Sequence, residues 1–359
     1  MEWFIETRFG DPVLSIDIST ELLVYGSALG QVGCYNFSSK EQFLLTEMAE
    51  ESIKGIHISE DNLIYASVGD LYVMVLIRDD NKDWHMEGVC HQGREHTNLL
   101  CGYTQIMQHK TKVCLLVIEE DRDTLNSIRA EGKNKLIVTN SATGENEEFL
   151  NQVFPKYSVP FYFNSEKLLW LERDLSGQRA LKLLTFNPLN TRTIKYLEKS
   201  FGSITCPYIV QENIIFVHNF RFIRTLDIAT GEEMGIIGEH LSEIVAIFPT
   251  MVCIQQNSDR AGQENNLLAV KYLVIAVDKE GKLRVWQEGN LMEEIDLCNM
   301  DGITVDSSDR FFGMGYPYVL KASGNILAVS TDVGILVIKS EYLNSVGGID
   351  PLNNYTNTI

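Results

Sequence analysis

The sequence predicts an all-β protein in which small antiparallel sheets form a closed ring. A pattern of short strand-type runs separated by polar turns recurs seven times along the 359 residues. Long segments with apolar residues at the helical period of 3.6 are almost absent. The seventh unit is one strand short, whereas one strand-type segment is left over at the N-terminus. Together these features favour a ring whose two ends meet.

Each unit consists of runs of about four to eight residues that are rich in Val, Ile, Leu, Tyr and Phe, as expected for strands of an all-β fold. The predicted strands of the first four units are Val13–Ile18, Glu21–Gly26, Gln31–Asn36 and Phe43–Leu45; Ile53–Ile58, Leu63–Val68, Leu71–Ile77 and Trp84–His91; Thr97–His109, Val113–Glu119, Lys135–Asn140 and Glu148–Leu150; and Tyr157–Phe163, Leu168–Glu172, Ala180–Phe186 and Thr193–Leu197. Those of the last three are Ile204–Ile209, Ile214–His218, Phe222–Asp227 and Met234–Ile237; Ile244–Phe248, Leu267–Val277, Leu283–Gln287 and Met292–Leu297; and Tyr318–Ala322, Ile326–Ser330 and Ile335–Ile338.

The N-terminal segment Glu2–Phe9 alternates polar and apolar residues and belongs to none of these units. If it pairs as the outermost strand of the last sheet, every sheet has four strands. Such closure hides the edges that an open stack of sheets would have to protect.

Three stretches do not follow the repeat. Glu119–Lys133 is predicted to be a polar, acidic insertion, and Gln256–Asn266 a flexible loop. The segment from Val346 to the C-terminus is polar and is predicted to be poorly ordered unless a partner holds it.

Turn residues follow the third strand of several units. Val138–Glu145 and Thr225–Glu232 both end in Ala-Thr-Gly-Glu, which places turn-forming side chains between two strands. In the sixth unit an aromatic residue precedes the turn, in Trp286-Gln287.

These runs and turns resemble the WD-repeat family of β-propellers, and the Ala-Thr-Gly-Glu turns are equally similar to quinoprotein-type propeller repeats. The resemblance covers roughly Glu2–Ser340 and implies a seven-bladed β-propeller whose last blade is closed by the N-terminal strand. Residues 1–345 would form this single domain, and residues 346–359 a polar tail. The Gly-His and Trp-Asp pairs of the family are missing, and only Trp286-Gln287 and Tyr35-Asn36 are similar to the second. The sequence therefore assigns no position to the family's Asp-His-Ser/Thr-Trp hydrogen-bond network.

Composition limits the classes of partner. Lys and Arg total 30 against 49 Asp and Glu, which gives a formal net charge of −19 and a pI near 4.8. Such a chain repels phosphate backbones and anionic membrane surfaces, so we expect no nucleic-acid partner. No apolar run approaches the roughly 20 residues that span a bilayer, and acids replace the basic start of a signal peptide. The seven scattered cysteines are typical of reduced, buried thiols. We expect a cytoplasmic protein, with cytoskeletal, ciliary, nuclear and organelle-matrix locations also open.

No catalytic, cofactor-binding or metal-binding residues are predicted. Cys90, His91, His96 and Cys101 are the best metal candidates, but their spacing matches no CxxC pair. We expect these cysteines in strands and these histidines in a loop. The segment Asp121–Asn126 lacks the glycine and the distal glutamate of a calcium loop. Nucleophile elbows and phosphate-binding loops do not occur. The other histidines are scattered and are interpreted as sheet or loop residues.

One patch is a candidate for binding another protein. Phe220, Arg221, Phe222 and Arg224 lie at a predicted turn of the fifth unit, and aromatic residues beside arginine are enriched in interface hot spots. The alternative is that both aromatic rings pack within or between sheets.

We therefore expect a non-catalytic scaffold or adaptor that binds other proteins and no cofactor. The resemblance implies roles in cytoskeletal or ciliary, ubiquitin-ligase, trafficking or chromatin complexes. One alternative is a propeller enzyme with a site in the central channel, against which the apolar innermost strands argue. Another is a reader of peptide motifs with a groove near Arg221 and Arg224.

Overall fold

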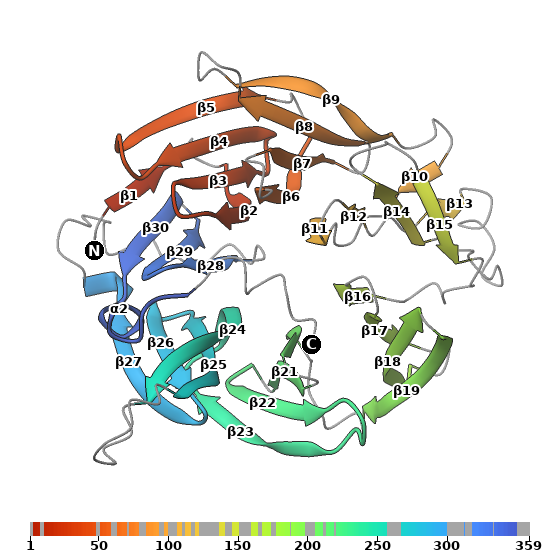
Figure 1. The fold of residues 1–359 in the computed structure, drawn as a ribbon, viewed down its shortest axis with the longest axis vertical. Helices are drawn as coiled ribbons and strands as arrows, with labels where there is room; N and C mark the ends of the chain where they lie inside the picture. The colour runs from red at the N-terminus through yellow and green to blue at the C-terminus, as the bar shows by residue number, and fades with distance from the viewer. Residues whose placement is uncertain are drawn as a thin grey trace.

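The structure, a computed structural model, describes residues 3–7, 11–47, 51–58, 63–69, 72–78, 84–92, 97–99, 106–109, 112–115, 119–121, 136–140, 146–150, 159–163, 167–173, 177–186, 188–197, 205–210, 213–218, 220–256, 267–299, 312, 318–332 and 334–349. These residues form seven four-stranded antiparallel sheets and one two-stranded sheet. Figure 1 shows the sheets arranged around a common centre, with the fourth strands of the first six along the rim. The all-β prediction is confirmed.

The sheets follow the chain in order. The first four are β2 (Val13–Ile18), β3 (Leu22–Ser27), β4 (Gln31–Asn36) and β5 (Glu41–Glu47); β6 (Ile53–Ile58), β7 (Ile64–Val68), β8 (Tyr72–Arg78) and β9 (Trp84–Gln92); β11 (Ile106–His109), β12 (Lys112–Leu115), β14 (Leu136–Asn140) and β15 (Asn146–Leu150); and β16 (Val159–Phe163), β17 (Lys167–Arg173), β18 (Arg179–Phe186) and β19 (Leu189–Leu197). The last three are β20 (Thr205–Val210), β21 (Asn213–His218), β22 (Phe222–Asp227) and β23 (Glu233–Glu239); β24 (Ile244–Gln256), β25 (Leu267–Asp278), β26 (Lys282–Gln287) and β27 (Asn290–Asp296); and β28 (Leu320–Ser323), β29 (Ile326–Thr331), β30 (Gly334–Lys339) and β1 (Trp3–Glu6).

The N-terminal strand completes the last sheet, as predicted. β1 pairs antiparallel with β30, and Ile5 lies opposite Ile335. The Ile5 side chain is buried in a core that the first and last sheets share. Gly334 allows the close approach of the two strands, because a Cβ atom there would lie 2.3 Å from the carbonyl oxygen of Ile5. The two ends of the chain's repeat are therefore joined by hydrogen bonds and by buried apolar surface.

The third unit differs from the prediction in two places. The predicted strand Thr97–His109 is divided, because β10 (Thr97–Leu99) pairs with β13 (Glu119–Asp121) in the separate two-stranded sheet. The predicted acidic insertion therefore begins with a strand. This strand, β13, was not predicted because its side chains are polar. Its backbone groups nevertheless need hydrogen-bond partners, which β10 supplies.

The first strand of the sixth sheet is longer than predicted. β24 continues beyond Phe248 to Gln256, and its register with β25 runs from Ile244 opposite Asp278 to Gln256 opposite Leu267. The long apolar run of β25 needs a backbone partner over its full length, which the extended β24 supplies. Gln256, the first residue of the predicted flexible loop, therefore lies in a strand, and residues 257–266 of that loop lie outside the described residues.

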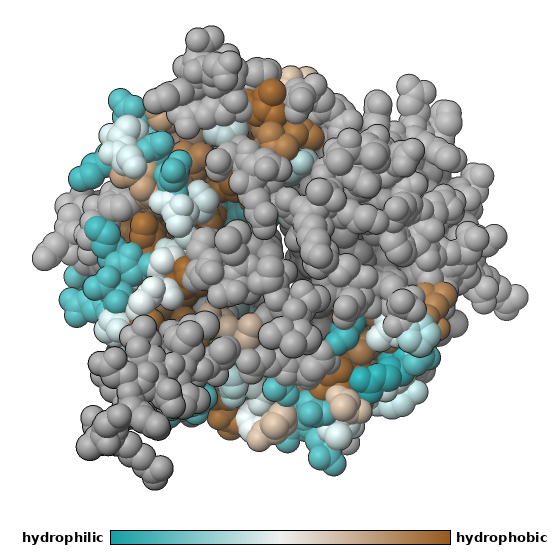
Figure 2. Space-filling view, viewed as in Figure 1, coloured by the Kyte–Doolittle hydropathy of each residue, from teal (hydrophilic) through white to brown (hydrophobic). Residues whose placement is uncertain are grey.

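Neighbouring sheets pack face to face through apolar side chains. Separate buried clusters lie between the first and second sheets, the fourth and fifth, the fifth and sixth, the sixth and seventh, and the seventh and first. Burial of each Val, Ile or Leu side chain in them stabilises the fold by roughly 1.5–3 kcal/mol. Figure 2 shows hydrophilic residues along the left rim of the molecule and hydrophobic residues closer to its centre.

A short C-terminal helix packs beside the last sheet. α2 (Glu341–Ser345) is capped by Ser340, whose hydroxyl accepts a hydrogen bond from the backbone N–H of Leu343 at 3.0 Å. Ile349 is 1% exposed and pairs with Gly324, so residues 346–349 of the predicted tail pack against the sheet. The rest of that tail lies outside the described part of the chain. No helix within the described ranges is long and apolar enough to cross a membrane.

Candidate partner-binding site

The structure places the predicted binding residues at the turn between β21 and β22. Phe220 and Arg221 lie in the turn, and Phe222 is the first residue of β22, opposite His218 and Glu239. Phe220 has a φ of +61° and its side chain is 41% exposed. A left-handed backbone is uncommon for a residue other than glycine, so the surrounding structure must hold this turn in place.

Three hydrogen bonds hold the turn against the loop that leads into the sixth sheet. The backbone N–H of Ile244 donates to the carbonyl oxygen of Phe220 at 2.6 Å. The N–H of His240 donates to the carbonyl oxygen of Arg221 at 3.0 Å, and Nε of Arg221 donates to the carbonyl oxygen of His240 at 3.0 Å. The turn and the loop therefore form one rigid unit that spans the fifth and sixth sheets.

This unit exposes two apolar side chains beside charged ones. Leu241, the residue after His240, is 73% exposed. The Arg221 guanidinium pairs with the Glu239 carboxylate at 3.4 Å, and both side chains are about half exposed. We call Phe220, Arg221, Glu239 and Leu241 the turn–loop patch. Glu239 and Leu241 were not predicted as binding residues from the sequence. The only sequence signal for them is that Leu241 is a single leucine in an otherwise polar loop.

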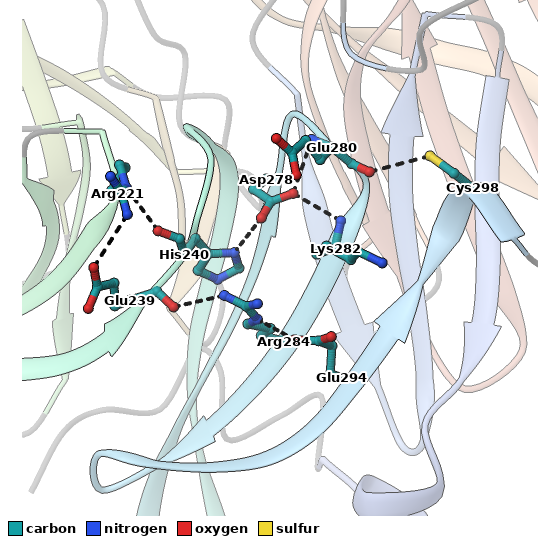
Figure 3. A network of polar contacts seen from close by, with 9 residues as sticks. All are labelled: Arg221, Glu239, His240, Asp278, Glu280, Lys282, Arg284, Glu294 and Cys298. Carbon is teal, nitrogen blue, oxygen red and sulfur yellow. Dashed lines mark hydrogen bonds and ion pairs between the residues drawn. The ribbon is translucent and has the colours of Figure 1, made fainter. Parts of the chain in front are cut away.

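A buried histidine lies between two residues of the patch, Glu239 and Leu241. His240 is fully buried, and its Nδ1 lies 3.0 Å from Oδ2 of Asp278. The other oxygen of Asp278 accepts the backbone N–H groups of Glu280 and Lys282 at 3.1 and 3.0 Å. Burial by itself would raise the pKa of Asp278, but the hydrogen bonds from His240 and these N–H groups outweigh it and lower that pKa. Figure 3 shows how these contacts connect the patch to the turn after β25.

The partly buried indole of Trp286 packs beside His240. Its ring lies 6.4 Å from the His240 ring, and a Cβ atom on Gly238 would lie 2.9 Å from the indole. Sequence analysis assigned no position to an Asp-His-Ser/Thr-Trp network because the family's residue pairs are missing. The structure brings Asp278, His240 and Trp286 together from three separate segments. Among the described residues, none hydrogen-bonds Nε2 of His240 or Nε1 of Trp286.

The other two predicted binding residues lie apart from the patch. Phe222 and Arg224 share a face of β22 with Leu226, which belongs to the core between the fourth and fifth sheets. The Arg224 guanidinium stacks 5.6 Å from the Phe222 ring centre and pairs with Glu233 at 2.6 Å. The four predicted residues therefore divide into one pair at the patch and one pair turned toward the fourth sheet.

A second buried His–Asp pair joins the innermost strands of the first and second sheets. Nδ1 of His57 on β6 lies 2.9 Å from Oδ2 of Asp17 on β2, which also accepts the N–H of Ile58 at 2.8 Å. Burial opposes the charge of Asp17, but His57, followed by Lys321 and Ile58, lowers its pKa. Both residues are at most 3% exposed. The pair links the first and second sheets by a hydrogen bond. It was not predicted from the sequence, because the innermost strands were interpreted as apolar.

Of the four predicted metal candidates, only Cys90 and His91 lie within the described residues. His91 lies in strand β9 beside Cys90, so its predicted loop position is wrong. His96 and Cys101 lie outside the described residues. Within those residues, no group of three or more His, Cys, Asp and Glu side chains is placed to hold a metal ion.

Comparison with known proteins shows the fold. No protein-family model and no curated protein matches this chain. An oligogalacturonate lyase in complex with manganese is similar with a TM-score of 0.60 and 16% identity, over 90% of this chain and 87% of that one. The WD40 β-propeller domain of Doa1 is similar with a TM-score of 0.55 and 13% identity, over 94% of this chain and 96% of that one. The computationally designed Ika8 protein has a TM-score of 0.50 and 16% identity, with 94% and 98% covered. At such identities the likeness shows a β-propeller fold and nothing about function.

Proposed function

We propose that this chain is a non-catalytic scaffold or adaptor that uses a seven-bladed, WD-repeat-like ring to hold other proteins in a larger assembly. The turn–loop patch is the observation that carries this proposal. It exposes Phe220 at 41% and Leu241 at 73% on backbone that three hydrogen bonds hold in place. Ring closure is supported by the pairing of β1 with β30.

The patch has the properties of a binding hot spot. An aromatic and a leucine side chain lie between charged groups, an arrangement in which a partner can bury the apolar centre and keep the charged rim solvated. The patch is already ordered before a partner binds, which lowers the entropy cost of association. Docking of an apolar partner side chain here would gain binding energy mainly from Phe220 and Leu241.

The charge of the chain supports a protein partner. A net charge of −19 opposes association with nucleic acid and with anionic membranes. We propose a cytoplasmic assembly of the cytoskeletal or ciliary, ubiquitin-ligase or trafficking type.

The test is co-purification of the tagged full chain at native expression, followed by mass spectrometry. A double variant, Phe220→Asn with Leu241→Ser, removes both exposed apolar groups and keeps a residue at position 220 that tolerates a left-handed backbone. The matched control is Leu189→Ser, which removes a leucine that is 54% exposed on β19. We expect stable partners with the unaltered chain and the control, and their loss with the double variant. A chain that purifies alone, or partners that the double variant retains, would contradict the proposal.

An enzyme with a site in the central channel is the second candidate, because Asp17 and His57 form a general acid–base type of pair on innermost strands. Their burial supports a fastening role instead. A hydrolase and lyase screen of the purified chain distinguishes the two. An activity that His57→Gln abolishes without lowering the melting temperature would replace the scaffold proposal.

A further inference from the structure

We infer that a cleft between the first and last sheets binds a lysine or arginine side chain from an extended, basic segment of a partner protein. This second site lies on other sheets than the turn–loop patch and does not depend on it.

The cleft lies where the two ends of the repeat meet. It has a volume of about 440 Å³ and is lined by Glu6, Thr7, Tyr25, Gln31, Gln42 and Leu44. Such a volume lies within the range of roughly 300–1,000 Å³ that is typical of binding pockets. Glu6, Gln42 and Leu44 are exposed, whereas Thr7 and Tyr25 are buried. The cleft therefore has an accessible mouth and a buried floor.

The floor is held in position by contacts across the two sheets. Nε2 of Gln42 donates to the hydroxyl oxygen of Tyr25 at 2.9 Å and to the backbone carbonyl of Glu6 at 3.2 Å. The Tyr25 ring lies directly over Gly33, where a Cβ atom would be 2.2 Å from Cζ of the ring. Burial raises the pKa of Tyr25, so its hydroxyl stays uncharged while its oxygen accepts the hydrogen bond from Gln42.

The lining residues favour a cation with an aliphatic stem. Glu6 supplies a carboxylate, and the side-chain amides of Gln31 and Gln42 supply further oxygen acceptors. Leu44, 56% exposed, supplies an apolar wall. A lysine or arginine side chain matches both parts, because its methylene stem covers apolar surface while its charged head binds the carboxylate. The net charge of −19 attracts such groups from solution and repels anions.

The edge of the first sheet indicates that the segment is extended. β5 pairs with β4 and is the outer strand of its sheet. It has neither the lysine nor the proline that often protects an edge strand, and it exposes Phe43 at 44% beside Leu44. An added strand would place every second side chain on the Leu44 face, which lines the cleft. By contrast, β27 is covered at Glu293, whose carboxylate accepts hydrogen bonds from Ser340 and from the N–H of Glu341.

The experiment is selection of a phage-displayed random peptide library on the purified full chain. The bound peptides are then measured by fluorescence anisotropy against three variants. Glu6→Lys reverses the charge at the mouth, and Leu44→Asp removes the apolar wall. Glu21→Lys makes the same change of charge at an exposed turn of the same sheet, away from the cleft lining.

We expect selected peptides in which Lys or Arg alternates with β-branched residues. Their Kd should rise about tenfold or more in Glu6→Lys and in Leu44→Asp, and change little in Glu21→Lys. The Phe220→Asn, Leu241→Ser variant should bind them like the unaltered chain, which separates this inference from the proposed function. Failure to enrich any peptide, enrichment without basic residues, or equal loss in Glu6→Lys and Glu21→Lys would overturn the inference. Melting temperatures near that of the unaltered chain show that the variants are folded. If Glu6→Lys is not folded, Glu6→Gln, which removes the charge alone, replaces it.

Discussion

Two junctions between neighbouring sheets have similar apolar packing but differ in their polar contacts. Between the fifth and sixth sheets, His240 and Asp278 fill the polar space, and hydrogen bonds connect the turn of one sheet to the entry loop of the next. Between the last and first sheets, the exposed Gln42 makes a polar connection, and a cleft remains beside it. The filled junction creates a rigid outer patch, whereas the open junction leaves a site that another molecule can enter.

The largest expected effect comes from breaking the filled junction. His240→Ala leaves the carboxylate of Asp278 buried without its histidine partner, so the free energy of unfolding should fall by about 2–3 kcal/mol. Urea unfolding followed by tryptophan fluorescence measures it. Glu21→Ala, at an exposed turn, serves as the control and should change stability by less than about 0.5 kcal/mol. An equal loss in both variants would remove the distinction between the two junctions.

Breaking the pairing of β1 with β30, within the sheet that borders the open junction, should cost less. Gly334→Ala brings a Cβ atom to within 2.3 Å of the Ile5 carbonyl oxygen, so β1 must shift away from β30. We expect a loss of about 2 kcal/mol and faster proteolysis near the N-terminus. Gly324→Ala separates the clash from backbone strain, since Gly324 also has a positive φ of 59° but has no atom within 4 Å of its added Cβ. If both variants lose the same stability, the close approach of β1 is not the cause.

The pH dependence of stability sharpens the comparison of buried acids. The folded pKa values of Asp17 and Asp278 are lowered, so the unfolded chain binds more protons than the folded chain at acid pH. Their contribution is present above the unfolded pKa of about 3.9 and is lost as the pH falls through the lower folded values. The free energy of unfolding, measured downward from neutral pH, should therefore fall below about pH 4. A double variant with Asp17→Asn and Asp278→Asn should be less stable at neutral pH and should lose less on acidification. An unchanged acid profile would show that other carboxylates dominate.

The smallest effect is expected from the polar connection of the open junction. Gln42→Ala removes two hydrogen bonds at a partly exposed position, so the loss should be below about 1 kcal/mol. Peptides selected on the cleft should lose less affinity than with Glu6→Lys, because Gln42 supplies one acceptor of the cleft whereas Glu6 and Leu44 remain. Differential scanning fluorimetry together with anisotropy measures both quantities. A loss comparable to that of His240→Ala would show that the two junctions are equally dependent on polar contacts.

Most of the fold could be predicted from local patterns. Runs such as Val13–Ile18 and Phe222–Asp227 carry strand-forming residues and turns within themselves, and their observed bounds agree with the prediction. Counting the strands predicted that the N-terminal segment completes the last sheet, and the pairing of β1 with β30 confirms this prediction. β13 and the far half of β24 were missed because their strand character depends on the partner strand more than on their own residues.

The candidate sites were predicted only in part. The turn that contains Phe220 and Arg221 follows from the sequence, but Leu241 is brought to it by the hydrogen bonds of its loop neighbours His240 and Ile244. Phe222 and Arg224 are separated from that pair because they lie within β22, on the face that carries Leu226, whereas Phe220 and Arg221 lie in the turn before the strand. The cleft at Glu6 and Leu44 has no local signal, since its walls come from two different sheets.

The sequence by itself determined the secondary structure and the repeat, because apolar alternation and turn residues act over a few neighbouring positions. Only the tertiary structure decided which polar residues meet. Asp278 finds His240, and Asp17 finds His57, across about forty positions of chain, as the sequence separations of 38 and 40 residues record. Such contacts depend on how the sheets pack against one another. This packing is driven by the burial of apolar surface, which is non-directional, so no local sequence pattern identifies the polar residues that it brings together.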